Sequence, residues 1–259
     1  MRNIIYFCTC FLLISCSSKP IKTLKVGMEL AYPPFETKDA HGNPTGISVD
    51  IAHALGEHLG IPVIIENIAW NGLIPSLQTG KIDAVISSMT ITEDRKNEVD
   101  FSDPYATAYL ALLISKKSDI QSVEDLNKPD KILAVKQGTT AYLYAKKYLS
   151  NVILNTFTSE SAAVTEVIQG KADAFIYDQL TIYRNNVQNP STTRTVFIPV
   201  QNEPDQWGIA VKKGNTELLN KINKFLVDFK KNGGYEKISD KYLKEEKQIF
   251  DDMGFKFFF

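Results

Sequence analysis

Cysteine and histidine are scarce in this chain of 259 residues, which has three of each. The three cysteines are Cys8, Cys10 and Cys16, so the chain beyond residue 16 cannot form an internal disulfide. No cluster of cysteine or histidine has the spacing of a metal site. We therefore expect the fold to depend on a hydrophobic core and to need no metal or other cofactor.

An excess of charge of one sign is also missing, since the formal net charge is −1. This balance argues against a nucleic-acid partner, which would require a strongly basic surface. No segment after residue 16 is apolar enough to span a bilayer, which takes roughly 20 apolar residues. What remains is about 240 residues, enough for two lobes of ordinary domain size.

The first 16 residues have the form of a bacterial lipoprotein signal peptide. Arg2 gives a short positive start, a mostly apolar stretch follows, and Leu13-Ile14-Ser15-Cys16 resembles a lipoprotein cleavage box. A transmembrane anchor is the alternative, but the apolar stretch is short for one. We expect cleavage before Cys16, lipidation of that residue, and a tether at residues 17–23. The protein would then be held by lipid on the periplasmic or cell-surface side of a membrane.

An internal repeat organises the rest of the chain. The sequence LQTGKIDAVI at residues 77–86 returns as VIQGKADAFI at residues 167–176, displaced by 90 positions. The match extends backward loosely, since PVII at residues 62–65 resembles NVIL at residues 151–154. With this extension, each copy is typical of a strand, a helix, a Gly-Lys-x-Asp turn and a second strand. Two such copies predict an α/β fold with two similar lobes, each built on a mostly parallel sheet flanked by helices.

The segment at residues 84–105 combines a short apolar run with hydroxyl groups and charges. Ser87, Ser88 and Thr90 follow the predicted strand, and Thr92 begins a predicted helix that carries Arg95. Ligands of α/β proteins bind beyond the carboxyl ends of strands. A guanidinium there can hold a carboxylate through two charge-assisted hydrogen bonds. Our hypothesis is that this segment binds the backbone end of a free amino acid; a strand, turn and helix with a solvated arginine is the alternative.

The repeat places Asp178 where Ser88 stands in the first copy. If the lobes face each other, Asp178 can hold an α-ammonium while Arg95 holds the α-carboxylate; an exposed acid is the alternative. In the second lobe, Gly138 is followed by Thr139 and Thr140 at a predicted helix start, where backbone amides bind anions. We expect both threonines to complete the carboxylate site, although a plain helix cap would also explain them.

Several motifs resemble those of the periplasmic polar amino-acid binding proteins, the solute-binding components of ABC importers. These motifs are VGMELAYPPFE, SSMTITEDR, VKQGTTA, GKADAFIYD and GIAVKKG, and the likeness covers essentially the whole mature chain. The resemblance implies a type II periplasmic-binding-protein fold, in which two lobes are joined by two hinge strands. Lobe 1 would comprise residues 24–108 plus 208–244, and lobe 2 residues 109–207.

The resemblance also implies roles for individual residues. Arg95 and the backbone amide of Thr140 would bind the ligand carboxylate, and Asp178 would bind the ammonium with the Ser88 carbonyl and the Thr90 hydroxyl. Tyr32 and Trp70 would pack on the ligand side chain, which Glu29 would help to select. The full set of expected ligand-binding residues is Glu29, Tyr32, Trp70, Ser87, Ser88, Met89, Thr90, Arg95, Lys136, Thr139, Thr140 and Asp178.

The hinge strands are expected at residues 108–114 and in the segment before Trp207. Residues 245–259 run past the usual end of the family, and their phenylalanines would either pack on the body or form a contact elsewhere. The expected function is therefore that of a monomeric receptor, not an enzyme, that closes on one L-amino acid and is recognised by an ABC transporter permease.

The identity of the amino acid rests on the side chains at the far end of the site. Glu29 and Trp70 favour arginine or lysine, through charge attraction and cation–π contact. Lys136 opposes this preference, because pairing with Glu29 would leave a neutral polar pocket that suits glutamine. Two other classes share the fold: dehydratase-like enzymes, which would alter the ligand, and sensory modules, which would signal through a partner.

Overall fold

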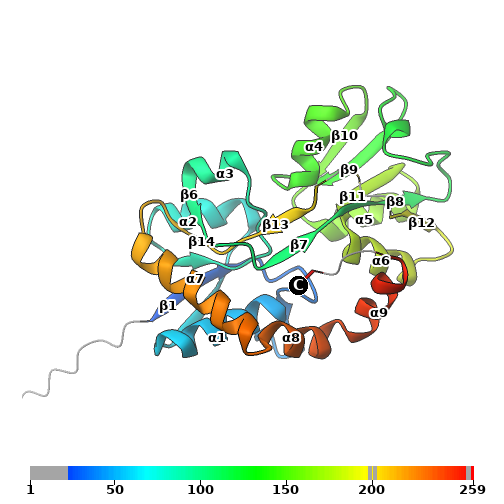
Figure 1. Ribbon diagram of the computed structural model, residues 1–259. Coiled ribbons are helices and arrows are strands. Elements are labelled where there is room, and N and C mark those ends of the chain that lie inside the picture. Colours follow the sequence, from blue (N-terminus) through cyan, green and yellow to red (C-terminus); the bar gives the residue numbers. More distant parts are fainter. Residues whose placement is uncertain (1–22, 198–199, 201–202, 255–257) are drawn as a thin grey trace, which may run out of the picture.

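The computed structural model describes residues 23–197, 200, 203–254 and 258–259. Its helices and strands are arranged around two separate β-sheets, one in each half of the molecule (Figure 1). The predicted signal peptide, the lipidation site at Cys16 and almost all of the predicted tether lie outside the described residues. Across the part of the chain that is described, no helix has the length and apolar character that crossing a membrane would require.

The first sheet has the strand order β4-β1-β5-β14-β6. Strand β1 is parallel to β4 and β5, whereas β14 is antiparallel to β5 and β6. The strands are β1 (Leu24–Met28), β4 (Val63–Asn67), β5 (Ala84–Val85), β6 (Val99–Phe101) and β14 (Ala210–Lys212). The helices of this half are α1 (Ile47–Leu59), η1 (Trp70–Gly72), α2 (Leu73–Gln78), α3 (Glu93–Glu98), α7 (Thr216–Lys231) and α8 (Gly234–Tyr242). A short hairpin of β2 (Thr37–Lys38) and β3 (Pro44–Thr45) precedes α1.

Both faces of this sheet are covered, which explains its continuous apolar strands. Ala84 belongs to a buried cluster with residues of α1 and α7, including Leu55 and Phe225. Its neighbour Val85 points to the opposite face, where it clusters with Leu73 of α2. Successive strand residues thus contribute to two separate cores.

The second sheet repeats this arrangement with the order β10-β9-β11-β8-β12. Strand β9 is parallel to β10 and β11, and β8 is antiparallel to β11 and β12. The strands are β8 (Leu110–Ser115), β9 (Ile132–Lys136), β10 (Ile153–Phe157), β11 (Ala174–Asp178) and β12 (Thr193–Val196). The helices are η2 (Glu124–Leu126), α4 (Thr140–Tyr148), α5 (Glu160–Gln169) and α6 (Gln179–Gln188).

The repeat of 90 positions is visible in the elements themselves. Strands β4 and β10 begin at residues 63 and 153, and β5 and β11 begin at residues 84 and 174. In each half the repeat supplies two of the three parallel strands, which flank β1 or β9, and two further strands complete the sheet through antiparallel pairing. The predicted α/β fold with two similar halves is confirmed.

A two-stranded ribbon joins the halves. It consists of β7 (Ala106–Ala108) and β13 (Asp205–Trp207), which pair antiparallel and run between the two sheets in Figure 1. Most of the segment predicted as the first hinge strand, residues 108–114, belongs instead to β8 inside the second sheet. That segment is apolar throughout because β8 is fully buried between β11 and β12, whereas the ribbon itself lies just before it.

The C-terminal segment packs on the body of the protein. Helix α9 (Lys244–Asp252) places Glu246 in an ion pair with Arg184 of α6, and buried Phe250 contacts Tyr183 of the same helix. Phe258 is buried, and its carbonyl accepts a hydrogen bond of 2.8 Å from the Thr107 amide of the ribbon. The sequence left open whether the terminal phenylalanines pack on the body of the protein or form a contact elsewhere. Phe258 packs on the body. Phe255 and Phe257 lie outside the described residues.

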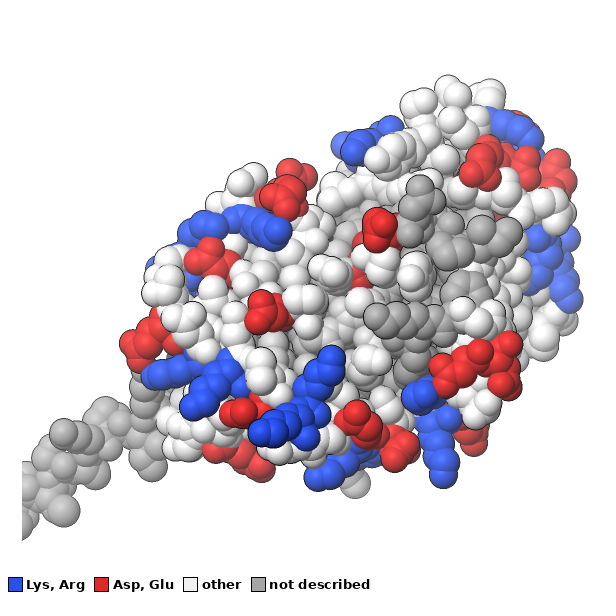
Figure 2. Space-filling view, in the orientation of Figure 1, with Lys and Arg blue, Asp and Glu red and all other residues white. Residues whose placement is uncertain are grey.

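Charged side chains are mixed on the surface. On the face shown in Figure 2, lysine and arginine are interspersed with aspartate and glutamate, and no area of one sign dominates. This distribution agrees with the balanced composition of the chain.

Candidate ligand-binding site

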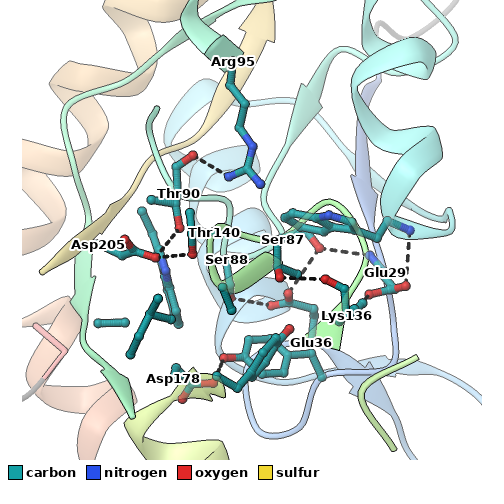
Figure 3. Close-up of a pocket in the computed structure, with 18 residues that line it drawn as sticks. Glu29, Glu36, Ser87, Ser88, Thr90, Arg95, Lys136, Thr140, Asp178 and Asp205 are labelled. Carbon is teal, nitrogen blue, oxygen red and sulfur yellow. Dashed lines mark hydrogen bonds and ion pairs between the residues drawn. The ribbon is translucent and has the colours of Figure 1, made fainter. Parts of the chain in front are cut away.

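A cavity lined mostly by polar residues lies between the two halves, beside the ribbon, with about 540 Å³ of empty space that includes its opening to solvent. Its walls come from the segments that follow β1 and β5, from η1 and α3, from strands of the second sheet and the start of α4, and from both ribbon strands (Figure 3). The lining residues are Glu29, Tyr32, Glu36, Trp70, Ser87, Ser88, Thr90, Arg95, Ala108, Leu110, Lys136, Thr139, Thr140, Ala141, Tyr177, Asp178, Asp205 and Trp207.

Arg95 provides the positive charge at one end of the cavity. It lies in α3, whose N-cap residue Thr92 accepts a hydrogen bond from the Arg95 amide at 3.3 Å. The guanidinium donates to the Thr90 carbonyl at 2.7 Å and to the Gly138 carbonyl at 3.0 Å, so it contacts both halves of the protein. Burial lowers the pKa of Arg95 to about 10, with Asp205 acting in the opposite direction, so the side chain stays charged at neutral pH.

The start of α4 lies close to this guanidinium. Thr139 is the N-cap residue: its hydroxyl accepts from the Tyr142 amide at 3.3 Å and donates to the Lys136 carbonyl at 2.8 Å. Thr140 begins the helix, and its hydroxyl donates to Asp205. Both hydroxyl protons are therefore engaged within the protein, which leaves backbone amides as the anion donors of this helix start.

Asp178 provides a negative charge on the part of the cavity wall that belongs to the second half of the protein. It ends β11 and caps α6, accepting hydrogen bonds from the amides of Leu180 and Thr181 at 3.0 and 3.1 Å. Tyr32 of the other half donates its phenolic hydrogen to the second carboxylate oxygen. Burial raises the pKa of Asp178, and the hydrogen bonds oppose that change. A cation placed beside this carboxylate would favour its charged form.

Ser88 has an unusual backbone conformation at the end of β5. Its φ angle of 49° lies in the left-handed region, which is costly for a residue with a side chain. Its hydroxyl donates to Glu36 at 3.1 Å, and Ser87 connects the same carboxyl group to the Glu29 amide. The serine pair is thus held in place by the Glu36 carboxyl group and by the Glu29 backbone amide.

Glu29 and Lys136 form an ion pair across the gap between the two sheets. Trp70 lies beside them: its backbone amide donates to Glu29 at 3.2 Å, and its indole nitrogen donates to the Gly138 carbonyl at 3.1 Å. The Lys136 nitrogen lies 5.7 Å from the centre of the Trp70 ring, and the Arg95 guanidinium carbon lies 5.2 Å from it. Both cations therefore lie within cation–π distance of one aromatic ring.

Glu36 is a second buried acid that the sequence interpretation did not identify. Only 1% of its surface is exposed, and it accepts hydrogen bonds from the hydroxyls of Ser48, Ser87 and Ser88. Burial raises its pKa to about 8, although the serine hydrogen bonds act in the opposite direction. The carboxyl group is therefore mostly protonated at pH 7.

Eleven of the twelve residues predicted from the sequence lie on the cavity wall. The exception is Met89, which is buried with Leu73 and Val99 in the core beneath α2. It follows two wall residues in sequence, but its side chain points to the other side of the chain.

Seven further wall residues were not predicted. They are Glu36, Ala108, Leu110, Ala141, Tyr177, Asp205 and Trp207. Two signals could have found some of them, since Glu36 ends the motif that contains Tyr32 and Asp205 lies in the segment expected to form a hinge strand.

No group of three or more His, Cys, Asp or Glu side chains among the described residues is arranged to hold a metal ion. The cavity instead presents two cations, Arg95 and Lys136, together with the carboxyl groups of Glu29, Glu36, Asp178 and Asp205. Such a wall can bind a small molecule that carries charges of both signs.

Curated relatives include two amino-acid receptors. The L-arginine-binding protein of Pseudomonas aeruginosa is 32% identical over 229 residues, which is 86% of this chain and 88% of that protein. The ABC transporter glutamine-binding protein GlnH of Bacillus subtilis is 37% identical over 208 residues, 79% of this chain and 75% of that protein.

A solved structure shows the same likeness in three dimensions. The ancestral amino acid-binding protein AncCDT-1, described as a precursor of cyclohexadienyl dehydratase, superposes with a TM-score of 0.77 at 42% identity. The match covers 85% of this chain and 94% of that one. The profile of the bacterial extracellular solute-binding proteins, family 3, matches residues 24–245. This chain therefore belongs to family 3 of the bacterial extracellular solute-binding proteins, with the type II periplasmic-binding fold.

Proposed function

We propose that this protein is the receptor of an ABC importer and binds a free polar L-amino acid between its two halves. The observation that carries the proposal is the pair of opposite charges on one cavity, Arg95 from the first half and Asp178 from the second. The α-carboxylate of a free amino acid needs the first and its α-ammonium needs the second. The composition of the wall thus matches a zwitterion.

We also propose the division into lobes that the resemblance implies, and the two sheets support it. We assign residues 24–108 plus 208–244 to lobe 1 and residues 109–207 to lobe 2, because every strand of the first sheet lies in the first set and every strand of the second sheet lies in the second. Contacts between the lobes lie at the cavity or beside it: Tyr32 donates a hydrogen bond to Asp178, Trp70 donates one to the Gly138 carbonyl, and Glu29 pairs with Lys136. Ligand binding would favour this closed arrangement over an open one through a hinge motion at the ribbon.

A basic side chain is the first candidate for the ligand. Once Arg95 and Asp178 have taken the two backbone charges, Glu29 and Lys136 are the charged side chains that remain beside Trp70. The Glu29 carboxylate and the ring of Trp70 both attract a cation. Arginine or lysine fits this wall, and one relative is named for arginine.

Glutamine is the second candidate, and the ion pair between Glu29 and Lys136 is the observation that favours it. The pair cancels one charge and offers an acceptor and a donor side by side, as a carboxamide group requires. Another relative is named for glutamine.

Calorimetric titration of the ligand-stripped protein against each of the twenty L-amino acids tests the proposal. We expect tight binding of a polar amino acid, with arginine and lysine ahead of glutamine. Mass spectrometry of the ligand after incubation separates a receptor, which returns it unchanged, from a dehydratase-like enzyme. Silence across all twenty amino acids would refute the receptor proposal and favour the enzyme or sensory alternatives.

The Glu29→Gln variant tests the assignment of the side-chain end. Loss of the carboxylate leaves Lys136 unpaired, so we expect arginine or lysine to bind about tenfold more weakly or worse, and glutamine to lose less. Titration of the parent and the variant with each amino acid measures the effect. Glu57→Gln, the same change at an exposed position, serves as the control. Equal losses for all three ligands would contradict the assignment.

We also propose that Cys16 carries the lipid that holds the receptor on the outer side of a membrane. The support is the cleavage-box sequence at residues 13–16. Metabolic labelling with a radioactive fatty acid should mark the parent and not the Cys16→Ser variant, and labelling of both would refute the assignment. Sedimentation of the unlipidated protein tests the expectation of a monomer.

A further inference from the structure

Asp205 lies on the cavity wall, where it accepts hydrogen bonds from residues of both lobes. It begins ribbon strand β13 and stands opposite Ala108 of β7. One of its carboxylate oxygens, Oδ2, accepts a hydrogen bond from the Thr90 hydroxyl of lobe 1 at 3.2 Å. The same oxygen accepts a hydrogen bond from the Thr140 hydroxyl of lobe 2 at 2.5 Å. Both bonds are drawn in Figure 3.

The direction of these hydrogen bonds is fixed by chemistry. An ionised carboxylate can only accept, and a threonine hydroxyl has one proton to donate and two lone pairs. Because Thr90 and Thr140 each give that proton to Asp205, neither hydroxyl has a proton left for the ligand. What the two oxygens can still offer to the cavity is lone pairs.

Of the two charged backbone groups of an amino acid, lone pairs suit only one. The α-ammonium is a donor with three N–H groups, and the α-carboxylate is an acceptor that such oxygens would repel. Without the Asp205 acceptor, the same hydroxyls could rotate and turn their protons toward the cavity. The carboxylate therefore decides which ligand group these threonines recognise.

We propose that Asp205 is a positioning residue for recognition of the α-ammonium group: it takes the hydroxyl protons of Thr90 and Thr140, so that both oxygens face the ligand as acceptors. This inference rests on the proposed amino-acid receptor function and adds to the site a residue that acts through the two hydroxyls. It also ties ammonium recognition to closure, since the two threonines come from different lobes.

The test compares each protein's affinity for the preferred amino acid with its affinity for the des-amino analogue. The analogue is 5-guanidinopentanoate if arginine is the ligand and glutaramate if it is glutamine. Two variants differ in what they keep: Asp205→Asn retains an acceptor oxygen but no charge, and Asp205→Leu retains neither. Calorimetry gives the affinity ratio for each protein, and thermal unfolding confirms that the variants are folded.

We expect the parent to prefer the amino acid strongly. Asp205→Leu should reduce that preference about tenfold or more, and Asp205→Asn should stay within about threefold of the parent, because the acceptor is what orients the hydroxyls. The double variant Thr90→Val, Thr140→Val should reproduce the loss, and adding Asp205→Leu to it should cost little more, since residues that act as a unit are not additive. The Thr90→Val, Thr140→Val double variant tests the role of the hydroxyls even if Asp205→Leu alone folds poorly.

The outcomes separate the inference from the function on which it rests. A parent that binds no amino acid refutes the receptor proposal. A parent that binds well, with an unchanged preference in Asp205→Leu, refutes the role of Asp205 alone. Equal losses in Asp205→Asn and Asp205→Leu would show that the negative charge acts on the ammonium directly, and would overturn the role through the hydroxyls.

Discussion

At the scale of the residue, the fold strongly changes the pKa of the buried Glu36 carboxyl group. It is surrounded by three serine hydroxyls and has almost no exposure to water. Burial raises its pKa from the ordinary value of 4.5 to about 8, so the folded protein holds this proton more tightly than the unfolded chain does. The stability that results is complete below pH 4.5 and is lost as the pH rises toward 8.

The Glu36→Gln variant should remove this pH dependence. Between pH 5 and pH 8 the parent should lose roughly 2–4 kcal/mol more of its free energy of unfolding than the variant does. Comparison with the variant is essential, because burial also raises the pKa values of Asp178 and Glu160. Denaturant unfolding at several pH values measures the difference, with exposed Glu93→Gln as the control. Parallel profiles for parent and Glu36→Gln would contradict the account.

Residue types and the family resemblance together indicated most of the cavity wall. Arg95 and Asp178 could be predicted because a strand end, a helix start and a repeat locate them in the sequence. Asp205 was harder to assign: its segment was expected to form a hinge strand, but its partner Thr90 is 115 positions away and no periodic pattern marks which residue of the segment faces the cavity. Met89 was placed in the site by its neighbours, whereas the turn after β5 directs it into the core.

At the scale of the element, the loop between β9 and α4 closes the cavity from the side of lobe 2. Gly138 adopts a φ angle of +75°, and its carbonyl accepts hydrogen bonds from Trp70 and Arg95 of lobe 1. A Cβ atom at this position would lie 2.7 Å from the Asn71 side-chain oxygen and 3.3 Å from the Trp70 indole nitrogen. The loop can approach lobe 1 this closely because the residue has no side chain.

Gly138→Ala should therefore weaken ligand binding, by about tenfold, because the new contacts arise across the closed gap between the lobes. Gly80→Ala is a matched control, since Gly80 has a φ angle of +74° and open space where its Cβ would be. Both variants should lose about 1–2 kcal/mol of stability to backbone strain, and only Gly138→Ala should lose affinity. Titration calorimetry and denaturant unfolding provide the two measurements; equal affinities would refute the role of this loop.

The elements themselves were predictable where their pattern is periodic. The repeat identified β4, β5, β10 and β11 because buried parallel strands are rich in β-branched residues. The ribbon was harder to locate, because β7 and β13 have three residues each and β7 is followed by a longer apolar strand. Pairing between the two distant segments, which a sequence does not display, defines the ribbon.

At the scale of the whole molecule, the C-terminal segment contacts both lobes. Glu246 of helix α9 forms an ion pair with Arg184 of lobe 2. The ring centre of Phe258 lies 5.1 Å from that of Phe35 and 5.5 Å from that of Trp207. Trp207 belongs to the ribbon and lines the cavity. The segment therefore supports the ribbon from behind the ligand site, although the family profile ends at residue 245.

Phe258→Ala should lower the free energy of unfolding by about 3–5 kcal/mol, because it removes a fully buried aromatic ring. Met253→Ala, at an exposed position of the same segment, should change it by no more than about 0.5 kcal/mol. Guanidinium unfolding of the two variants and the parent tests the expectation. Similar stabilities for Phe258→Ala and Met253→Ala would mean that the segment contributes little to the fold.

The central claim, that the two lobes close on the charged backbone of an amino acid, is tested most directly at Arg95, which bonds both lobes. The measurement is a calorimetric titration of Arg95→Ala with the amino acid that the parent binds best, with exposed Lys96→Ala of the same helix as control. We predict a loss of roughly 2–5 kcal/mol of binding free energy for Arg95→Ala, because the ligand carboxylate would be left buried and unpaired. Binding within about threefold of the parent would contradict the account.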